Sequence, residues 1–352
     1  MTDLLQSISI DGRDIGPCHP PYIIAELSAN HNGDIERAFA IMRASKEAGA
    51  DAVKLQTYSA DTMTIDHDGP GFKIERGLWK GRKLYELYQE ASTPWEWHVP
   101  LFAYGKELGI TVFSTPFDDT AVAYLEEQNI PAYKVASFEL LDLPLIQTIA
   151  ATGKPMILST GMADRVEIEE AVEAARTGGC NELVILHCVS AYPATPEDSN
   201  LKIISDLASR FNCIVGLSDH TLGVVTSIAG VALGASIIEK HVTLRRSNGG
   251  PDSAFSLEPN ELSILCKETR TAWSAIGEVS YKRGTSEEDM SVLRRSLYAV
   301  EDIPKGATLS NKNIRAIRPG YGLPPKHFPN VLGKKATSLI LRGTPLSFDL
   351  FD

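Results

Sequence analysis

The strongest constraint on the fold is a repeated unit in which a helix-like stretch, a glycine and a β-branched run follow one another. The unit occurs at residues 46–56 (KEAGADAVKLQ), 106–115 (KELGITVFST) and 231–240 (VALGASIIEK). A glycine after a helical stretch is typical of a helix C-cap, because glycine adopts the left-handed conformation at little steric cost. A strand that starts directly after the cap predicts a chain of alternating helices and strands.

Eight short apolar runs are bounded in this way. They are residues 22–27, 52–56, 110–115, 132–137, 155–160, 183–188, 213–219 and 236–241, and helical-period stretches such as 34–49 and 164–179 separate them. Strands and helices in alternation are typical of a doubly wound sheet or a closed parallel barrel, and eight units favour an α/β fold of the (β/α)8 TIM-barrel type.

One gap between predicted strands is longer than the others and is rich in aromatic residues. It follows the second strand and contains residues 72–98. The segment is either an excursion packed against the rim of the barrel or a loop that covers substrate on the catalytic face. The sequence leaves both interpretations open.

The pattern changes after residue 280. A polar stretch at 284–289 reads as a linker, and the tail contains short strand-like runs and a Pro304-Lys305-Gly306 turn without a further repeat. We predict a TIM-barrel catalytic domain over residues 1–280, a linker over 281–292 and a small domain over 293–352. A domain of about 60 residues is small for an independent fold, so we expect it to lean on the barrel or on a second subunit.

Charge and composition argue against several classes of protein. A net charge of −11 disfavours general binding to nucleic-acid phosphates. The first 16 residues lack the basic and apolar regions of a secretory signal, so a cytoplasmic location is expected. The five scattered cysteines indicate neither a disulfide framework nor a zinc site. The uncharged stretch 221–238 contains three glycines and reads as a helix followed by a strand rather than a membrane span.

Polar side chains end every predicted strand, whereas the strand starts are mostly apolar. In a parallel barrel the carboxyl ends of the strands form the active face, so this one-sided polarity predicts a site there. The polar residues at these ends are Glu26, Lys54, Gln56, Ser114, Thr115, Lys134, Ser137, Glu139, Ser159, Thr160, His187, Ser190, Ser218, Asp219, His220, Glu239, Lys240 and His241.

Two lysines, Lys54 and Lys134, lie inside apolar strand runs, where an amine is costly unless an anion compensates it. Together with hydroxyls they would form a pocket for a phosphate and a carboxylate. The alternative is that each lysine pairs with a neighbouring Asp or Glu. The hydroxyls in question belong to Thr115, Ser137, Ser159 and Ser218.

Two histidines, His220 and His241, end consecutive strands, and Glu26 on the first strand would close the ring beside them. Two imidazoles and a carboxylate suit a divalent transition metal with positions open to substrate or water. A His and Glu acid–base pair without metal is the competing interpretation. Strand alternation places Glu239 on the same side as His241 and points Lys240 outward.

A series of motifs runs in order from near residue 20 to the C-terminus: AELSANHNG, GADAVKLQT, GLWKGRKLYELY, TPWEWH, STPF, YKVASFE, STGM, YPATPED, GLSDHTLG, IEKHVTL, DSAFSLEP, RRSLYAVEDIPKG and RPGYGLPPK. Together they resemble the sialic acid synthase family. The AELSANHN and FSLEP motifs and the aromatic insert resemble most closely its pseudaminic acid synthases.

This resemblance implies a TIM barrel followed by a small C-terminal antifreeze-like (SAF) domain, in a domain-swapped homodimer where each small domain caps the partner's site. It implies a transferase that condenses phosphoenolpyruvate with an acetamido sugar, 2,4-diacetamido-2,4,6-trideoxy-L-altrose, and releases phosphate. It also implies a divalent metal, Mn²⁺ or Mg²⁺.

Residue by residue, the resemblance implies that His220 and His241 are metal ligands and that Arg318 is donated by the small domain to the sugar. The residues that match phosphoenolpyruvate contacts are Lys54, Thr115, Lys134, Ser137, Ser159 and Ser218. Those that match groups around the sugar or the attacking water are Glu26, Gln56, Glu139, Tyr192 and Asp252. The catalytic set is thus Glu26, Lys54, Lys134, Glu139, His220 and His241.

Two departures concern the sugar. Ser190 replaces an asparagine of the neuraminic synthases, and an apolar contact from the start of their small domain has no clear equivalent near Val292. A neuraminic or legionaminic acid synthase is the nearest alternative function. A Schiff-base aldolase using Lys134 and a non-catalytic carbohydrate-binding protein are more distant ones.

Overall fold

The computed structural model describes residues 7–352. The chain divides into two compact units, one ending at Gly277 and the other comprising Glu278–Asp352. Each unit buries its own apolar side chains, so each has its own core.

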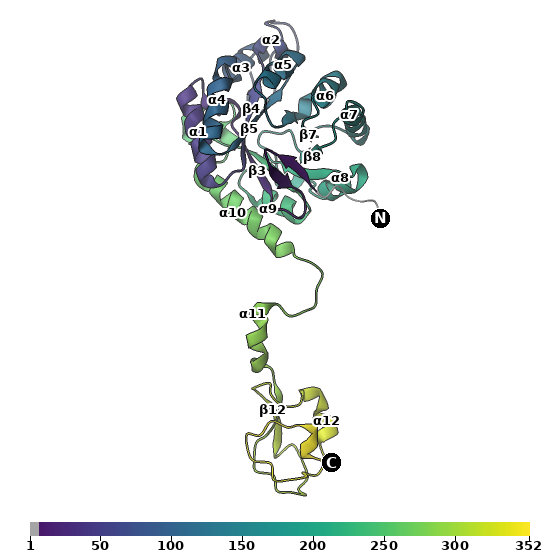
Figure 1. Cartoon of the computed structure of the whole chain (residues 1–352). Helices are drawn as coiled ribbons and strands as arrows, with labels where there is room; N and C mark the ends of the chain where they lie inside the picture. The colour runs from purple at the N-terminus through teal and green to yellow at the C-terminus, as the bar shows by residue number, and fades with distance from the viewer. Residues whose placement is uncertain (1–6) are drawn as a thin grey trace. The chain divides into compact units, whose positions relative to one another are not determined.

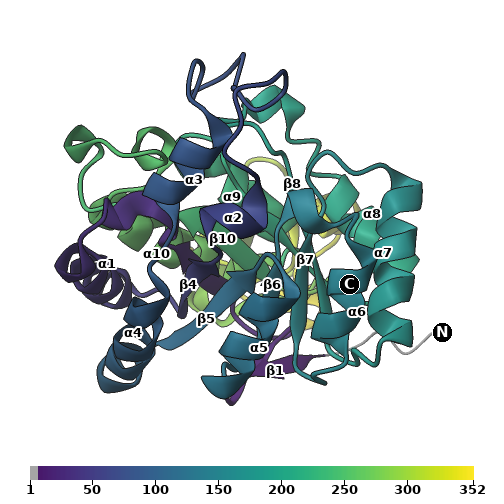
Figure 2. The ribbon, with the colours of Figure 1, turned by 90° about the horizontal axis from the view of Figure 1, so that it is seen from above.

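In the first unit, the described residues include eight parallel strands that close a barrel in the order β10-β3-β4-β5-β6-β7-β8-β9. Figure 2 looks at this unit from above, with helices around the strands. This confirms the predicted TIM barrel, and each predicted strand is present to within a few residues. The strands are β3 (Tyr22–Glu26), β4 (Ala52–Thr57), β5 (Thr111–Pro116), β6 (Tyr133–Val135), β7 (Met156–Ser159), β8 (Leu183–Cys188), β9 (Ile214–Ser218) and β10 (Ile237–His241).

Helices alternate with these strands and surround them (Figure 1). Gly49 and Gly109 end two of them in the left-handed conformation, as the repeated unit predicts. The helices are α1 (Ile35–Ala48), α4 (Trp95–Leu108), α5 (Asp119–Glu127), α6 (Leu143–Ala150), α7 (Arg165–Thr177), α8 (Ile203–Phe211), α9 (Val225–Ala232) and α10 (Pro259–Ile276). Within residues 7–352, no helix combines the length and apolar character needed to cross a membrane.

An antiparallel hairpin of β1 (Ile8–Ile10) and β2 (Arg13–Ile15) precedes the barrel. Its three isoleucines pack with the inward side chains of the strand starts, so the hairpin closes the amino-terminal end of the barrel interior. The sequence analysis missed this element. The turn Asp11-Gly12 between alternating apolar residues is the signal that could have found it.

The long insert after β4 contains two short helices, α2 (Ala60–Met63) and α3 (Leu84–Ala91). Most of residues 64–83 lie outside helices and strands and are exposed or half-buried. The segment therefore depends on contacts with other loops for its position.

The second unit contains an antiparallel pair, β11 (Ser296–Ala299) and β12 (Ile314–Ile317), with short helices α11 (Thr285–Glu288) and α12 (Phe328–Val331). Its core includes Leu297, Ile314 and Ile340. Antiparallel pairing of short strands agrees with the change of pattern seen in the sequence.

Candidate active site

The inward face of most barrel strands changes from apolar to polar along its length. Because side chains alternate across a strand, a core residue and the residue two positions later point to the same side. Inside the barrel, Ile24 is followed by Glu26 and Ile157 by Ser159. The same step leads from Ala52 to Lys54, from Phe113 to Thr115, from Ala132 to Lys134 and from Ile237 to Glu239. The predicted polar ends therefore converge inside the carboxyl end of the barrel.

Lys54 lies between two carboxylates at this end. Its Nζ is 2.6 Å from Glu26 Oε2 and 3.8 Å from Glu239 Oε1, and it donates to Thr115 Oγ1 at 3.1 Å. Burial raises the pKa of Glu26 to about 7 against the opposing effect of Lys54, and Glu239 adds a smaller upward contribution. Burial lowers the pKa of Lys54, but Glu239 and Glu26 outweigh it and keep the lysine charged. Lys54 thus pairs with neighbouring carboxylates, which was the alternative interpretation of the buried lysines.

Lys134 has a different environment. Its buried Nζ donates to the carbonyl of Val135 at 2.7 Å, and burial lowers its pKa. Ser159, on the next strand, is buried with no hydrogen-bond partner for Oγ. A buried amine and an unpaired hydroxyl are donors available to an anion.

Ser137 and Ser190 approach each other across Gly161. Ser137 Oγ accepts a hydrogen bond from the Gly161 N–H at 3.0 Å. A Cβ at residue 161 would lie 2.1 Å from Ser190 Oγ and 2.7 Å from Ser137 Oγ, so the absence of a side chain lets the two hydroxyls face the backbone there.

The two histidines are neighbours at the ends of β9 and β10. The ring centroids of His220 and His241 are 5.4 Å apart. The Nδ1–H of His220 donates to the carbonyl of Val189 at 2.9 Å. Burial lowers the pKa of His220, but Cys188 outweighs burial and raises it. Nδ1 of His241 is buried without a hydrogen-bond partner. Burial, and then the neighbouring His220, hold the pKa of His241 well below its ordinary value, so this ring is neutral.

These two rings fit a divalent metal, because both carry a nitrogen that no protein group uses. In residues 7–352, no group of three or more His, Cys, Asp or Glu side chains is arranged to hold a metal ion. A metal bound here would therefore take two ligands from His220 and His241 and the remainder from substrate or water.

A chain of hydrogen bonds leads from Glu26 to Asp252. Gln56 Nε2 donates to Glu26 Oε1 at 2.9 Å and to Ser28 Oγ at 3.0 Å, and Ser28 Oγ donates to Asp252 Oδ2 at 2.5 Å. Asp252 Oδ2 is 3.9 Å from His241 Nδ1, and burial raises the pKa of Asp252. The sequence analysis did not select Ser28, because a lone serine after a strand carries no distinguishing pattern.

Tyr192 covers the histidines from the side of β8. Its ring centroid is 4.6 Å from that of His220 and 5.2 Å from that of Phe255. Trp79, from the long insert, stacks on Tyr192 at 5.4 Å and donates from Nε1 to the carbonyl of Pro251 at 2.8 Å. These contacts support the covering-loop interpretation of the insert. Trp79 and Phe255 had no periodicity that would have identified them.

Of the remaining predicted residues, Glu139 and Ser218 belong to the barrel unit and Arg318 belongs to the second unit. Glu139 follows β6, with one carboxylate oxygen buried and unpaired, and burial raises its pKa to about 7. Ser218 donates to Glu239 Oε1 at 3.1 Å. Arg318 belongs to the second unit, directly after β12. The structure thus brings together the predicted residues of the barrel unit.

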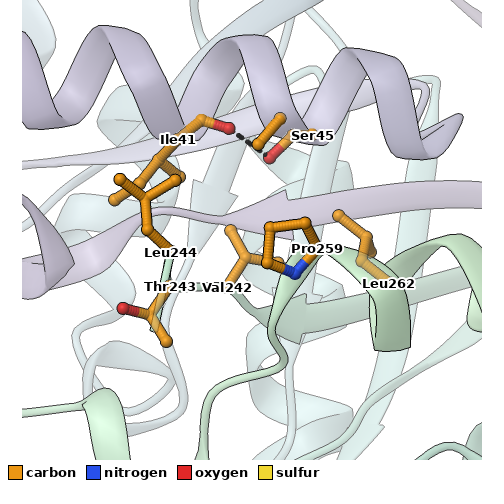
Figure 3. A pocket seen from close by; sticks show the side chains of 8 residues that line it. Ile41, Ser45, Val242, Thr243, Leu244, Pro259 and Leu262 are labelled. Atoms are coloured by element: carbon orange, nitrogen blue, oxygen red, sulfur yellow. Dashed lines mark hydrogen bonds between the residues drawn. The ribbon is translucent and has the colours of Figure 1, made fainter. Parts of the chain in front are cut away.

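A small pocket elsewhere in the barrel unit lies between α1 and α10 and is shown in Figure 3. Its lining is mainly apolar, and Ser45 Oγ already donates to the carbonyl of Ile41 at 2.8 Å. With no ionisable side chain in its lining, it offers no catalytic group.

Comparison with known families gives two matches along the chain. The model of the NeuB family matches residues 41–281, and that of the SAF domain matches residues 294–352.

Among proteins of known name, the chain is 44% identical to the pseudaminic acid synthase of Helicobacter pylori, over 94% of this chain and 97% of that protein. It is 35% identical to the N,N'-diacetyllegionaminic acid synthase of Legionella pneumophila, over 93% of this chain and 94% of that protein. Among solved structures, the N-acetylneuraminic acid synthetase of Leptospira borgpetersenii in complex with citrate superposes with a TM-score of 0.73 at 31% identity, covering 81% of this chain and 95% of that one.

Proposed function

The chain belongs to the NeuB family of nonulosonic acid synthases, and from this premise we propose that it is a pseudaminic acid synthase. As a member of this family, it is a phosphoenolpyruvate-dependent enzyme. This excludes the Schiff-base aldolase and the non-catalytic carbohydrate-binding protein as alternatives. The proposed reaction condenses phosphoenolpyruvate with 2,4-diacetamido-2,4,6-trideoxy-L-altrose to give pseudaminic acid and phosphate. The higher identity to pseudaminic acid synthases, 44% against 35% for the legionaminic enzyme, supports this choice of sugar.

The observation that carries the chemistry is a pair of buried lysines and a pair of histidines at the carboxyl ends of strands of the same barrel. In this proposal Lys54 and Lys134 hold the phosphate and carboxylate of phosphoenolpyruvate, assisted by nearby hydroxyls. Buried cations act strongly on an anion because little water screens them. The hydroxyls are those of Thr115, Ser137, Ser159 and Ser218.

His220 and His241 would hold the divalent metal, Mn²⁺ or Mg²⁺. When bound, the metal supplies Lewis acidity toward the aldehyde of the sugar. The neutral His241 ring suits this role because a metal ligand must present a lone pair, and His220 would release a proton on binding.

Carbon–carbon bond formation leaves two proton transfers for the chain's own groups. C3 of phosphoenolpyruvate attacks the aldehyde carbon, and the aldehyde oxygen takes up a proton to become a hydroxyl. Water then adds at C2 and loses a proton. Phosphate departs with cleavage of its C–O bond, and the C2 hydroxyl passes its proton to the phosphate as the ketone forms. Glu26, whose pKa is raised to about 7, suits the acceptance of the proton from water.

The sugar would occupy the side of the site bounded by Gln56, Glu139, Tyr192 and Asp252, beside Ser190. We further propose, on the family resemblance, that Arg318 of a second copy reaches this sugar in a domain-swapped homodimer. A cytoplasmic location, where phosphoenolpyruvate is produced, accompanies the proposal.

Phosphate release from phosphoenolpyruvate, measured with a panel of acetamido sugars, tests the proposal. We expect release with the trideoxy-altrose sugar, little with N-acetylmannosamine or the diacetamido sugar of legionaminic acid synthesis, and loss of activity on chelation that Mn²⁺ restores. Release with N-acetylmannosamine alone would overturn the choice of sugar. Full activity after rigorous removal of metal would overturn the metal assignment.

A further inference from the structure

The backbone ladder between β9 and β10 ends before the two histidines. Its last paired residues are Ser218 and Glu239, and one more backbone bond follows, from the Asp219 N–H to the Glu239 carbonyl at 3.0 Å. His220 and His241 lie beyond these bonds. His241 is paired with Glu26 of β3 instead, and the His220 carbonyl accepts from the Ala194 N–H at 3.0 Å. The backbone therefore fixes each histidine separately, and a link between the two must come from side chains.

A buried ion pair occupies this position. Lys240 Nζ is 2.9 Å from Asp219 Oδ2, and each side chain is only 1% exposed. Lys240 Nζ also donates to the carbonyl of Thr221. Lys240 thus contacts the residue before His220 and the residue after it.

The aspartate extends the same network to a helix. Asp219 Oδ1 accepts from the N–H and from the hydroxyl of Thr221, each at 2.8 Å. Asp219 Oδ2 accepts from Ser227 Oγ of α9 at 2.6 Å. Both carboxylate oxygens are therefore in use, and the turn that carries His220 is tied to β10 and to α9.

Lys240 lies on the side of β10 that faces away from the barrel interior. Because side chains alternate along β10, Lys240 points away from the barrel interior that Glu239 and His241 face. From this side Lys240 reaches the histidines only through its contacts with Asp219 and Thr221.

We propose that Asp219 and Lys240 are positioning residues that set the spacing and orientation of the His220 and His241 rings. The inference rests on the proposed role of these rings as metal ligands. A buried ion pair is a weak source of stability, because the loss of hydration offsets much of the attraction. Groups that orient metal ligands typically change metal affinity 10–100-fold when they are replaced.

The double variant Asp219→Asn with Lys240→Met tests the inference. Asparagine keeps the shape of aspartate and an oxygen for Thr221, and methionine keeps most of the length of lysine, so no buried charge is left unpaired. Each single variant leaves one unpaired charge and serves as the destabilised comparison. Asp51→Asn is the matched control, because Asp51 forms an ion pair with Arg270 just before β4, at the other end of the barrel.

Two measurements on the metal-free protein give the readout. Electron paramagnetic resonance of free Mn²⁺ should show that the double variant binds the ion about tenfold more weakly than wild type. The midpoint of its urea unfolding should equal that of wild type. Nuclear magnetic resonance of ¹⁵N-histidine protein should show that His220 no longer keeps its proton on Nδ1. The Asp51→Asn control should change neither.

A double variant with wild-type Mn²⁺ affinity and an unchanged His220 spectrum would overturn the inference. Failure of the proposed function looks different, because wild type and His241→Ala would then bind Mn²⁺ equally poorly. In that case His220 and His241 are not metal ligands, and the inference is wrong even if the spectrum of His220 changes in the double variant.

Discussion

Lys54 Nζ lies 2.6 Å from Glu26 Oε2, and the two side chains are 4% and 1% exposed. Glu239 approaches the same ammonium group at 3.8 Å. One lysine therefore compensates two buried carboxylates at the mouth of the barrel, and its removal leaves both without a cation in contact.

Lys54→Met should destabilise the barrel by about 3–5 kcal/mol, because breaking a buried ion pair from one side leaves an uncompensated charge. Tryptophan fluorescence during urea unfolding measures this, since Trp79, Trp95, Trp97 and Trp273 all belong to the barrel unit. Adding Glu26→Gln should restore much of the loss. A Lys54→Met variant as stable as wild type would contradict this account of the pair.

His241→Ala should reduce turnover by about a thousandfold or more while the barrel remains folded. Loss of a metal ligand removes several kcal/mol of transition-state stabilisation, and each 1.36 kcal/mol is a factor of ten in rate. Phosphate release measures the rate, and circular dichroism checks the fold. A collapse of the folded spectrum would show that His241 serves structure rather than catalysis.

The Glu139 carboxyl should make the barrel less stable as pH rises. Its folded pKa is raised to about 7 by burial, above the unfolded value near 4.5. Between these values the folded state binds more protons than the unfolded state, so the free energy of unfolding falls with rising pH.

Glu139→Gln keeps the side chain neutral and should remove this part of the pH dependence. We expect the variant to gain stability over wild type progressively from pH 4.5 to 7.5, with no gain below pH 4.5. Fluorescence-monitored urea unfolding at several pH values provides the comparison. A difference between the two proteins that is constant with pH would refute the raised pKa.

Trp79→Ala should raise the Michaelis constant for the sugar about tenfold and leave that for phosphoenolpyruvate unchanged. The substitution removes the ring contact with Tyr192 and the hydrogen bond to Pro251, which together hold the insert over the mouth. An aromatic pair contributes about 0.5–1.5 kcal/mol and a hydrogen bond about 1 kcal/mol. Limited proteolysis within residues 64–83 should become faster.

Trp79→Phe is the matched control, because it keeps a ring against Tyr192 and loses only the hydrogen bond. Its kinetic constants should fall between those of wild type and Trp79→Ala. Equal sugar kinetics in all three proteins would show that the insert does not reach the sugar.

The order of elements and the polar ends of the strands could be predicted from the sequence because both are local properties. Gly49 and Gly109 mark helix ends through their own backbone conformations. The two-residue period of a strand places Lys54 on the same side as Ala52 whatever surrounds it. The hairpin at Ile8–Ile15 was missed although its turn is local, since strands of three residues give little periodicity.

By itself, the sequence determined the barrel and the polar side chains at the carboxyl ends of its strands, but not Ser28, Trp79 or Phe255. Only the tertiary structure decided which side chains meet: Lys54 with Glu26 and Glu239, Trp79 with Tyr192, and Ser28 with Asp252, 224 residues away. Periodicity is set by each strand's own pleat, whereas partners across the mouth depend on how eight strands close and where the loops return. Closure is a property of the whole barrel and cannot be predicted from any single segment of the sequence.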